Sequence, residues 1–240
     1  NFMDESIIPN TLDFEKPAAY AFVRHPIIRY KHAITDDAYF AIAVEEPSTN
    51  AQSPAQSGTF ESPLPDLTAR YRITKGWGHV QLSGYAAYLK YRYTGEGSEE
   101  VTLYGGNLSG LFNVLGKKGK LTYQAIYGLG ASRYRGGLSA APDADGNLAA
   151  LPDLGLTVGY EHRWNSAFSS LILYNYGSVD NTEGQPGSAV ADTKYFAVNT
   201  LWHFAENAFV GVEYLWGQRD DLNGDNGAAN RLQFSVRYGF

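Results

Sequence analysis

Nine basic residues of this sequence could act together on an anionic solute. A guanidinium group binds both oxygens of a carboxylate through its planar fork, and an ammonium group adds a compact positive charge. If such groups line one enclosed surface, they concentrate anions there and speed their entry. The nine residues that we expect on such a surface are Arg24, Arg29, Lys31, Arg70, Arg72, Lys90, Arg92, Arg163 and Arg237. Among them, Arg29, Lys31, Arg70 and Arg72 are the best candidates.

Acidic residues are unevenly distributed along the same sequence. Three glutamates, Glu45, Glu161 and Glu213, share the polar positions with the basic residues. The other acidic residues lie mainly in connecting segments, so this surface is expected to be basic although the chain has a formal net charge of −6. Two interpretations stay open. The basic residues form a path for anions, or they pair with the three glutamates and keep an internal surface wet.

Other chemistries have little support in the sequence. The chain has no Cys, which removes thiol catalysis and Cys-based zinc sites, and it contains no G-x-S-x-G motif. The segment from Asp221 to Gly227 resembles the start of a calcium loop, but it lacks the glycine and the glutamate that complete one. Ordinary turns favour the same residue types, so calcium binding stays an alternative there. We expect no enzyme activity and no cofactor, and the negative net charge argues against nucleic-acid binding.

The last stretch of the chain, residues 230–240, shows how the basic residues would be positioned. Its even positions, from Leu232 to Phe240, are apolar or aromatic, and its odd positions, from Arg231 to Arg237, are polar. Such alternation predicts a β-strand with one apolar and one polar face. Its length is near the ~9–11 residues that a tilted strand needs to cross a bilayer. A strand of a soluble sandwich is the alternative for this segment alone.

Eleven segments show this alternation, and their connections indicate the fold class. They are approximately residues 20–33, 38–46, 66–74, 77–93, 101–115, 120–134, 153–164, 167–177, 194–204, 207–218 and 230–240. Connections of a few residues alternate with longer ones that are rich in Gly, Pro, Ser, Asn and Asp, which is typical of outer-membrane barrels. The sequence therefore predicts an all-β fold, a transmembrane antiparallel β-barrel, with residues 1–240 forming one domain.

One strand needs an irregularity to keep its apolar residues on a single face. In residues 77–93 the apolar positions change from even to odd numbers. We expect a β-bulge near Gly84 to Ala87, which would turn Lys90 and Arg92 into the lumen.

The first strand has a similar break at Pro26, which cannot donate a ladder hydrogen bond. The direction of Arg24 depends on that break. With this register, aromatic residues form two girdles at the membrane interfaces. They are Tyr91, Tyr93, Trp164, Tyr214, Trp216, Tyr238 and Phe240.

The strand count is odd, which has a consequence for topology. If Phe240 lies on the periplasmic side, the last strand and the eleventh from the end both run downward. A bacterial single-chain barrel has an even number of strands and starts upward from the periplasm. We therefore expect this chain to be the C-terminal portion of a larger barrel that has further strands upstream.

Several segments together resemble the DcaP-like outer-membrane porins. The resemblance rests on NFMDES with the following DFEKP and FVRHPIIRYKH, on GLGASRY, and on VGVEYLWGQRDDLNGDNGAANRLQFSVRYGF. It spans most of the chain and is strongest over residues 209–240. The resemblance implies a sixteen-stranded, homotrimeric porin for small anionic solutes such as dicarboxylates, of which this chain would supply strands six to sixteen.

The resemblance also implies a role for residues 1–17. In sixteen-stranded porins the loop between strands five and six folds into the lumen and narrows it. Residues 1–17 would then be the tail of this constriction loop, and an ordinary extracellular loop is the alternative.

The expected function is passive diffusion of small anions, with dicarboxylates implied by the resemblance, through a basic lumen. Its setting would be the bacterial outer membrane, where the barrel contacts lipid. A non-conducting structural or adhesive barrel is the alternative function.

Overall fold

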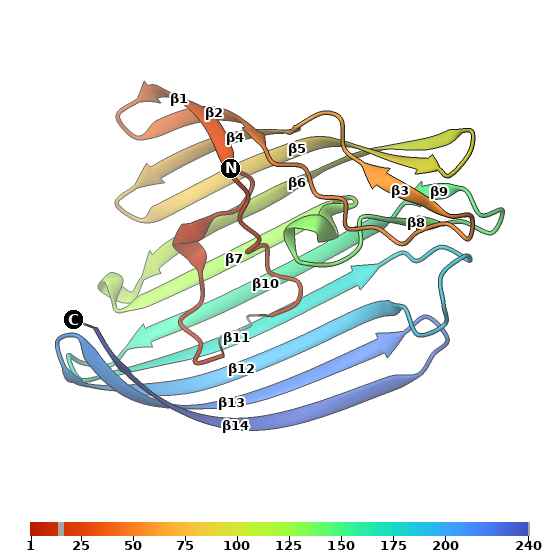
Figure 1. Cartoon of the computed structure of the whole chain (residues 1–240). Helices are drawn as coiled ribbons and strands as arrows, with labels where there is room; N and C mark the ends of the chain where they lie inside the picture. Colours follow the sequence, from red (N-terminus) through yellow and green to blue (C-terminus); the bar gives the residue numbers. More distant parts are fainter. Residues whose placement is uncertain (14–16, 240) are drawn as a thin grey trace.

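Eleven long strands form one antiparallel sheet in the computed structural model, which describes residues 1–13 and 17–239. Each of these strands pairs with the next one along the chain, so their order across the sheet follows the sequence (Figure 1). They are β1 (Ile27–Thr35), β2 (Ala38–Glu45), β4 (Asp66–Lys75), β5 (Gly78–Tyr93), β6 (Ser98–Val114), β7 (Gly119–Leu129), β10 (Pro152–Arg163), β11 (Phe168–Val179), β12 (Val190–Ala205), β13 (Ala208–Asp221) and β14 (Asn226–Tyr238). The predicted all-β, antiparallel fold is confirmed.

Shorter elements lie between and before these strands. They are η1 (Glu5–Ile7), β3 (Gly58–Glu61), η2 (Leu115–Lys117), η3 (Ala131–Tyr134), β8 (Ala140–Pro142) and β9 (Leu148–Ala150). β3 adds to β5, and β8 pairs with β9 in a separate hairpin. The long connections emerge at the right-hand end of the sheet in Figure 1, and the short turns at the left-hand end. No helix in the described ranges is long and apolar enough to cross a membrane.

The outer face of the sheet carries large apolar side chains. In β14, Leu232, Phe234 and Val236 are 61–73% exposed. The residues between them in the sequence, including Gln233 and Ser235, point to the other face because successive side chains of a strand alternate. An outward apolar surface with a polar inner face is the arrangement that a lipid-embedded barrel requires.

Two strand boundaries differ from the sequence prediction. β1 begins at Ile27 and not at residue 20, because the preceding backbone bonds to the inner face of the sheet and not to a neighbouring strand. β7 ends at Leu129 and not at residue 134, because Gly130 has a φ of 77°, a left-handed conformation that suits glycine, and starts η3.

The predicted β-bulge in β5 is wrong. β5 pairs with β6 without a register shift from Gly78 to Arg92. Its odd residues therefore face inward along the whole strand, and Lys90 and Arg92 lie on the outer face. Lys90 pairs there with Glu100 at 2.8 Å.

The same register corrects two of the predicted girdle residues. Tyr91 is buried on the inner side, and Tyr93 packs beside it. They belong to the interior of the protein and not to a membrane interface. Phe240, the last girdle residue, lies outside the described residues.

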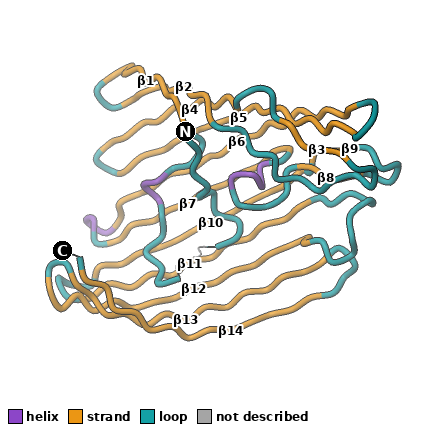
Figure 2. The backbone as a smooth tube through the Cα atoms, in the orientation of Figure 1, coloured by secondary structure: helices purple, strands orange, loops and turns teal. Residues whose placement is uncertain are grey.

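The sheet curves but does not close. Among the described residues, β1 and β14 each pair on one side only. Residues 1–13 and 17–26, hereafter the inner segment, run along the hollow side of the curved sheet (Figure 2). The strands thus form a wall, and the inner segment lies against its polar face.

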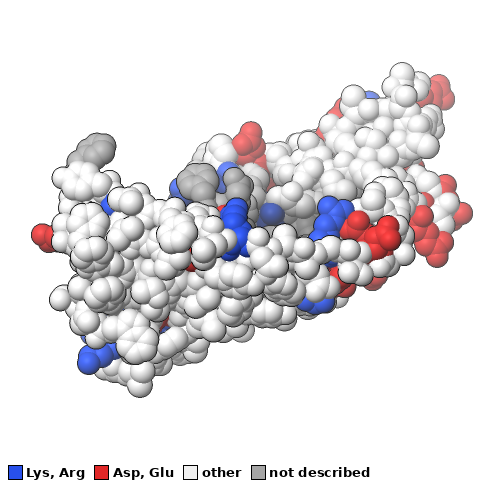
Figure 3. Space-filling view, turned by 90° about the horizontal axis from the view of Figure 1, so that it is seen from below, with Lys and Arg blue, Asp and Glu red and all other residues white. Residues whose placement is uncertain are grey.

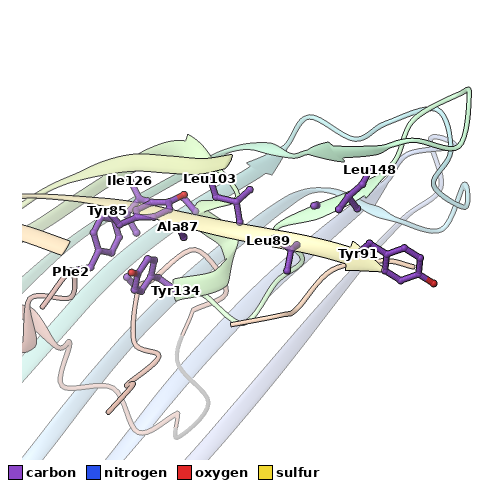
Figure 4. Close-up of a cluster of buried hydrophobic side chains, with 12 residues drawn as sticks. Phe2, Tyr85, Ala87, Leu89, Tyr91, Leu103, Ile126, Tyr134 and Leu148 are labelled. Carbon is purple, nitrogen blue, oxygen red and sulfur yellow. The ribbon is translucent and has the colours of Figure 1, made fainter. Parts of the chain in front are cut away.

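The largest buried apolar cluster also lies on the inner side (Figure 4). It joins Phe2 of the inner segment and Tyr134 of η3 to the long-connection ends of β5, β6 and β7. The ring centroids of Phe2 and Tyr134 are 4.3 Å apart. The other large members are Tyr85, Leu89, Tyr91, Leu103, Ile126 and Leu148. This cluster holds the inner segment and η3 together as one insert inside the wall.

Candidate functional site

The inner segment is anchored first by Asp4, whose carboxylate is completely buried. His79 Nε2 lies 2.7 Å from one carboxylate oxygen, and the hydroxyl of Ser109 donates to the same oxygen at 3.1 Å. Arg72 donates to the other oxygen at 3.2 Å. Burial alone would raise the pKa of Asp4, but the hydrogen bond and charge of His79, with the charge of Arg72, lower the pKa below its ordinary value of 3.8.

A second anchor lies near the opposite edge of the sheet. The carboxylate of Glu213 accepts hydrogen bonds from the backbone N–H groups of Leu12 and Asp13, each at 2.9 Å. Asn199 donates to the same carboxylate at 2.8 Å. Arg231 forms an ion pair with Asp13 at 2.6 Å. Inward polar side chains of three neighbouring strands therefore hold residues 12 and 13.

The part of the inner segment that leads to β1, residues 17–26, is held by amide side chains. Asn175 accepts from the Ala19 N–H at 3.0 Å, and Gln124 accepts from the Ala21 N–H at 2.9 Å. Phe22 and the following residue both donate to the carbonyl of Tyr134. These side chains replace the ladder partners that a strand would provide, because a buried backbone N–H needs an acceptor.

Two buried ion pairs fix η3 to the wall. Arg133 lies 2.6 Å from Asp66 at the start of β4, and Arg135 lies 2.6 Å from Asp153 near the start of β10. The phenol of Tyr134 donates to Glu45 at 3.2 Å. Arg133 and Arg135 are structural residues that were not predicted from the sequence. The sequence feature that could have indicated these ion pairs is an Asp at or near the start of each of two strands. Such a carboxylate can pair with a basic residue of a long connection.

A polar cleft lies between the inner segment and β1, β2 and β4. Its volume is about 400 Å³. The four guanidinium groups that line it are those of Arg24, Arg29, Arg70 and Arg72, together with the carboxylates of Glu5 and Glu45. We call it the arginine cleft. Burial lowers the pKa of His25, which also lines the cleft, and so disfavours the protonated form of this histidine.

Strand register explains why three of these arginines meet. Arg29 is paired with Ala43, and Arg70 is paired with Ala41. Directly paired residues project to the same face of a sheet, and the small alanines between the arginines leave room for the long side chains. Arg24 reaches the cleft from the inner segment.

The four arginines differ in their partners. Arg72 is held by Asp4 and Ser6, and Arg70 donates to the neutral Gln81 at 3.2 Å. The side chain of Arg24 is 71% exposed and lies 3.9 Å from Glu5. Within the described ranges, no acidic side chain forms an ion pair with Arg29 or Arg70. The cleft therefore carries uncompensated positive charge.

The remaining predicted site residues lie elsewhere. Lys31 is on the inner face of β1, 4.1 Å from the ring centroid of Tyr39. Arg163 lies at a short turn and donates to the carbonyl of Ser166 at 3.0 Å. Arg237 occupies an inward position of β14, which is the edge strand opposite β1. Lys90 and Arg92 are on the outer face, so they cannot line the lumen.

Acidic side chains gather at the other end of the wall. Figure 3 shows basic side chains along the middle of the molecule, and the largest acidic groups toward the end with the long connections. In the loop between β13 and β14, Asn223 donates to Asp225 at 2.7 Å. At the end of β13, Asp221 is paired with Arg219. Within the described part of the chain, no cluster of three His, Asp or Glu residues could hold a metal ion.

Solved structures with a similar fold are outer-membrane proteins. The crystal structure of the outer membrane channel DcaP of Acinetobacter baumannii matches 100% of this chain and 69% of that chain, with a TM-score of 0.86 and 21% sequence identity. OmpT, an outer membrane protein of Vibrio cholerae, matches over 88% of this chain and 63% of that chain, with a TM-score of 0.53 and 12% identity. Neither a scan of family models nor a search of curated proteins finds a match. The chain thus has the fold of an outer-membrane β-barrel.

Proposed function

We propose that this chain forms part of an outer-membrane porin that lets small anionic solutes diffuse through a basic constriction. The observation that carries the proposal is the arginine cleft, which is lined by four guanidinium groups and only two carboxylates. Positive charge on a wall of low dielectric concentrates anions locally and lowers the barrier to their entry.

The inner segment supports the same proposal as a constriction. It lies against the polar face of the wall and is fixed at Asp4, at Glu213 and at the amides of Asn175 and Gln124. A segment bound by so many buried hydrogen bonds narrows the space beside it without blocking the whole lumen. We therefore assign residues 1–17 to a constriction loop, with residues 14–16 outside the described ranges.

Dicarboxylates are the solutes that the cleft would suit best. Arg24 is largely exposed, while Arg29 and Arg70 lie on the facing strands without an acidic partner in the described ranges. Guanidinium groups on two sides of one cleft can each bind a carboxylate in a bidentate manner. A solute with two carboxylates would engage both sides at once.

We further propose that the functional barrel contains more strands and, as the resemblance to the DcaP-like porins implies, is a homotrimer. Unpaired backbone groups at the edges of β1 and β14 would be strongly unfavourable in lipid. The DcaP chain is longer than the region that this chain matches. Additional strands between the two edges would close the sheet and satisfy those groups.

A non-conducting barrel is the second candidate. The inner segment and η3 fill part of the inner side and pack there as one insert, which would favour a structural role if the added strands closed the remaining space.

The reversal potential of the native, membrane-purified protein in a planar bilayer under a salt gradient tests the proposal. We expect the reversal potential to lie close to the equilibrium potential of the anion. We also expect succinate to interrupt the current. Cation preference or absence of conductance would contradict the porin proposal and favour the structural barrel.

A further inference from the structure

We propose that a second cavity on the inner side, the vestibule cavity, binds small carboxylates that carry one charge and an apolar body. This inference rests on the proposed porin function and adds a separate binding step to it. The cavity has a volume of about 440 Å³, within the range of roughly 300–1,000 Å³ that is usual for small-molecule sites.

The walls of the vestibule cavity are mainly apolar. They come from the end of β11, the start of β12, the connection between these strands and the segment after η3. The large apolar residues are Leu138, Leu151, Val179, Pro186 and Val190. An apolar wall of this kind favours a solute with an apolar body, because both surfaces lose their contact with water.

The group that the cavity offers to an anion is the guanidinium of Arg135, whose charge is shared with the buried Asp153. Its Nη2 is paired with Asp153 at 2.6 Å and also donates to Ser132. Its Nη1 lies beside Gly177, where an added Cβ would stand 2.9 Å from that nitrogen. No described residue accepts a hydrogen bond from Nη1, and no carboxylate is among the lining residues. One guanidinium edge beside apolar walls is complementary to a single carboxylate on an apolar body.

The walls are held in place before any solute arrives. Asn181 donates to the carbonyl of Val190 at 2.9 Å, and Gln185 accepts from the backbone of Thr182 at 2.9 Å. Leu222 and Asn223 donate to carbonyls of the same connection. A preformed wall improves affinity because little ordering is needed on binding.

The vestibule cavity and the arginine cleft lie on either side of η3. Ser132 and Arg135 line the cavity, whereas Tyr134 lines the cleft. Ala18 and Val23 of the inner segment line the cavity and the cleft, respectively. A dicarboxylate would gain most in the cleft with its several arginines, and a monocarboxylate with an apolar body would gain most in the cavity.

Single-channel recording of the native, full-length protein tests the inference. The probes are benzoate, acetate, benzamide and succinate at equal concentration, added on the side of the long connections. We expect benzoate to interrupt the current for about tenfold longer than acetate, since its ring gains apolar contact, and longer than uncharged benzamide, since Arg135 binds the charge. Val190→Thr should shorten the benzoate events by about fivefold and leave succinate events unchanged.

Val23→Thr is the matched control, because it makes the same change in the arginine cleft and should leave benzoate events unchanged. Gly177→Ala is a second variant, which should also shorten benzoate events by crowding Nη1. The inference would be overturned if benzoate interrupted the current for no longer than acetate or benzamide. It would also be overturned if V190T and V23T changed the duration of benzoate events equally. If anion preference under the salt gradient persists in that case, the porin proposal stands. If the unmodified protein shows no anion preference, both the vestibule inference and the porin proposal are overturned.

Discussion

Asp4 and His79 meet at 2.7 Å although 75 positions separate them in the sequence. Both side chains are almost fully buried, with exposures of 0% and 4%. The same carboxylate is bound by Arg72 of β4 and Ser109 of β6. One charged residue therefore connects the inner segment to three adjacent strands, and the position of the segment depends on that charge.

Asp4→Asn should loosen the inner segment without unfolding the sheet. The amide cannot pair with Arg72 and His79, so a buried cation loses its partner, which costs about 3 kcal/mol of docking free energy. We expect faster protease cleavage within residues 1–26 and noisier single-channel current. Asp37→Asn is the control, because Asp37 pairs with Lys75 in an exposed turn and should change the cleavage rate little. Equal cleavage of both variants would contradict the role of Asp4.

Acid should release the inner segment through the same carboxylate. The folded state lowers the pKa of Asp4 below 3.8, so its contribution to docking is complete above 3.8 and is lost as pH falls through the lowered pKa. Current noise should stay constant from neutral pH to about pH 4 and rise only at lower pH. D4N should show raised noise throughout and lack this transition. A transition of the same size in D4N would exclude Asp4 as its source.

The arginine cleft should contribute to anion preference in proportion to its uncompensated charge. Arg29→Gln removes one such charge and should lower the permeability ratio of anions to cations by roughly threefold. Lys90→Gln is the matched control, because Lys90 lies on the outer face and pairs with Glu100. The reversal potential in a salt gradient measures both variants. A loss of selectivity in K90Q as large as in R29Q would contradict a local role for the cleft.

The ion pair of Arg133 and Asp66 should stabilise η3 only while both partners are present. Both side chains are 0% exposed and lie 2.6 Å apart. Arg133→Met leaves a buried carboxylate without its cation and should destabilise the protein by about 3–5 kcal/mol. The double variant R133M/D66N should recover much of that loss. The stability of each variant is measured by thermal unfolding in detergent, followed by the gel mobility of heated samples. If the destabilisation in the double variant equals the sum of the two single effects, the two residues are not coupled.

Alternation along the sequence was sufficient to predict the eleven strands, because lipid requires an apolar outer face on every one of them. In β1 and β4 the inner side is polar, so Arg29, Arg70 and Arg72 could be placed on it from parity alone. The ion pairs of η3 and the contacts of Asp4 join residues far apart in the sequence. No local pattern contains that information, since a buried charge is recognisable only when its partner is known.

The facing of side chains could not be predicted from parity where the inner side of the sheet is also apolar. Leu89 and Tyr91 belong to the buried inner cluster, and the ring of Tyr91 packs 4.8 Å from that of Phe60 in β3. The apolar residues of β5 therefore change sides while its backbone continues without a bulge. Alternation shows which residues avoid water, but it does not show whether lipid or protein covers them. At the long-connection end of β5, protein covers the apolar side.

Cysteine labelling can decide this register directly, since the chain has no natural Cys. Lys90→Cys should react quickly with a membrane-impermeant thiol reagent added outside cells, because the residue lies on the outer face near the long connections. Leu89→Cys should react at least tenfold more slowly, because Leu89 is 0% exposed, and opening of the packed cluster is needed for access. Denaturation before labelling should make both react alike, which controls for expression. Rapid labelling at position 89 with protection at position 90 would restore the bulge and return Lys90 and Arg92 to the lumen.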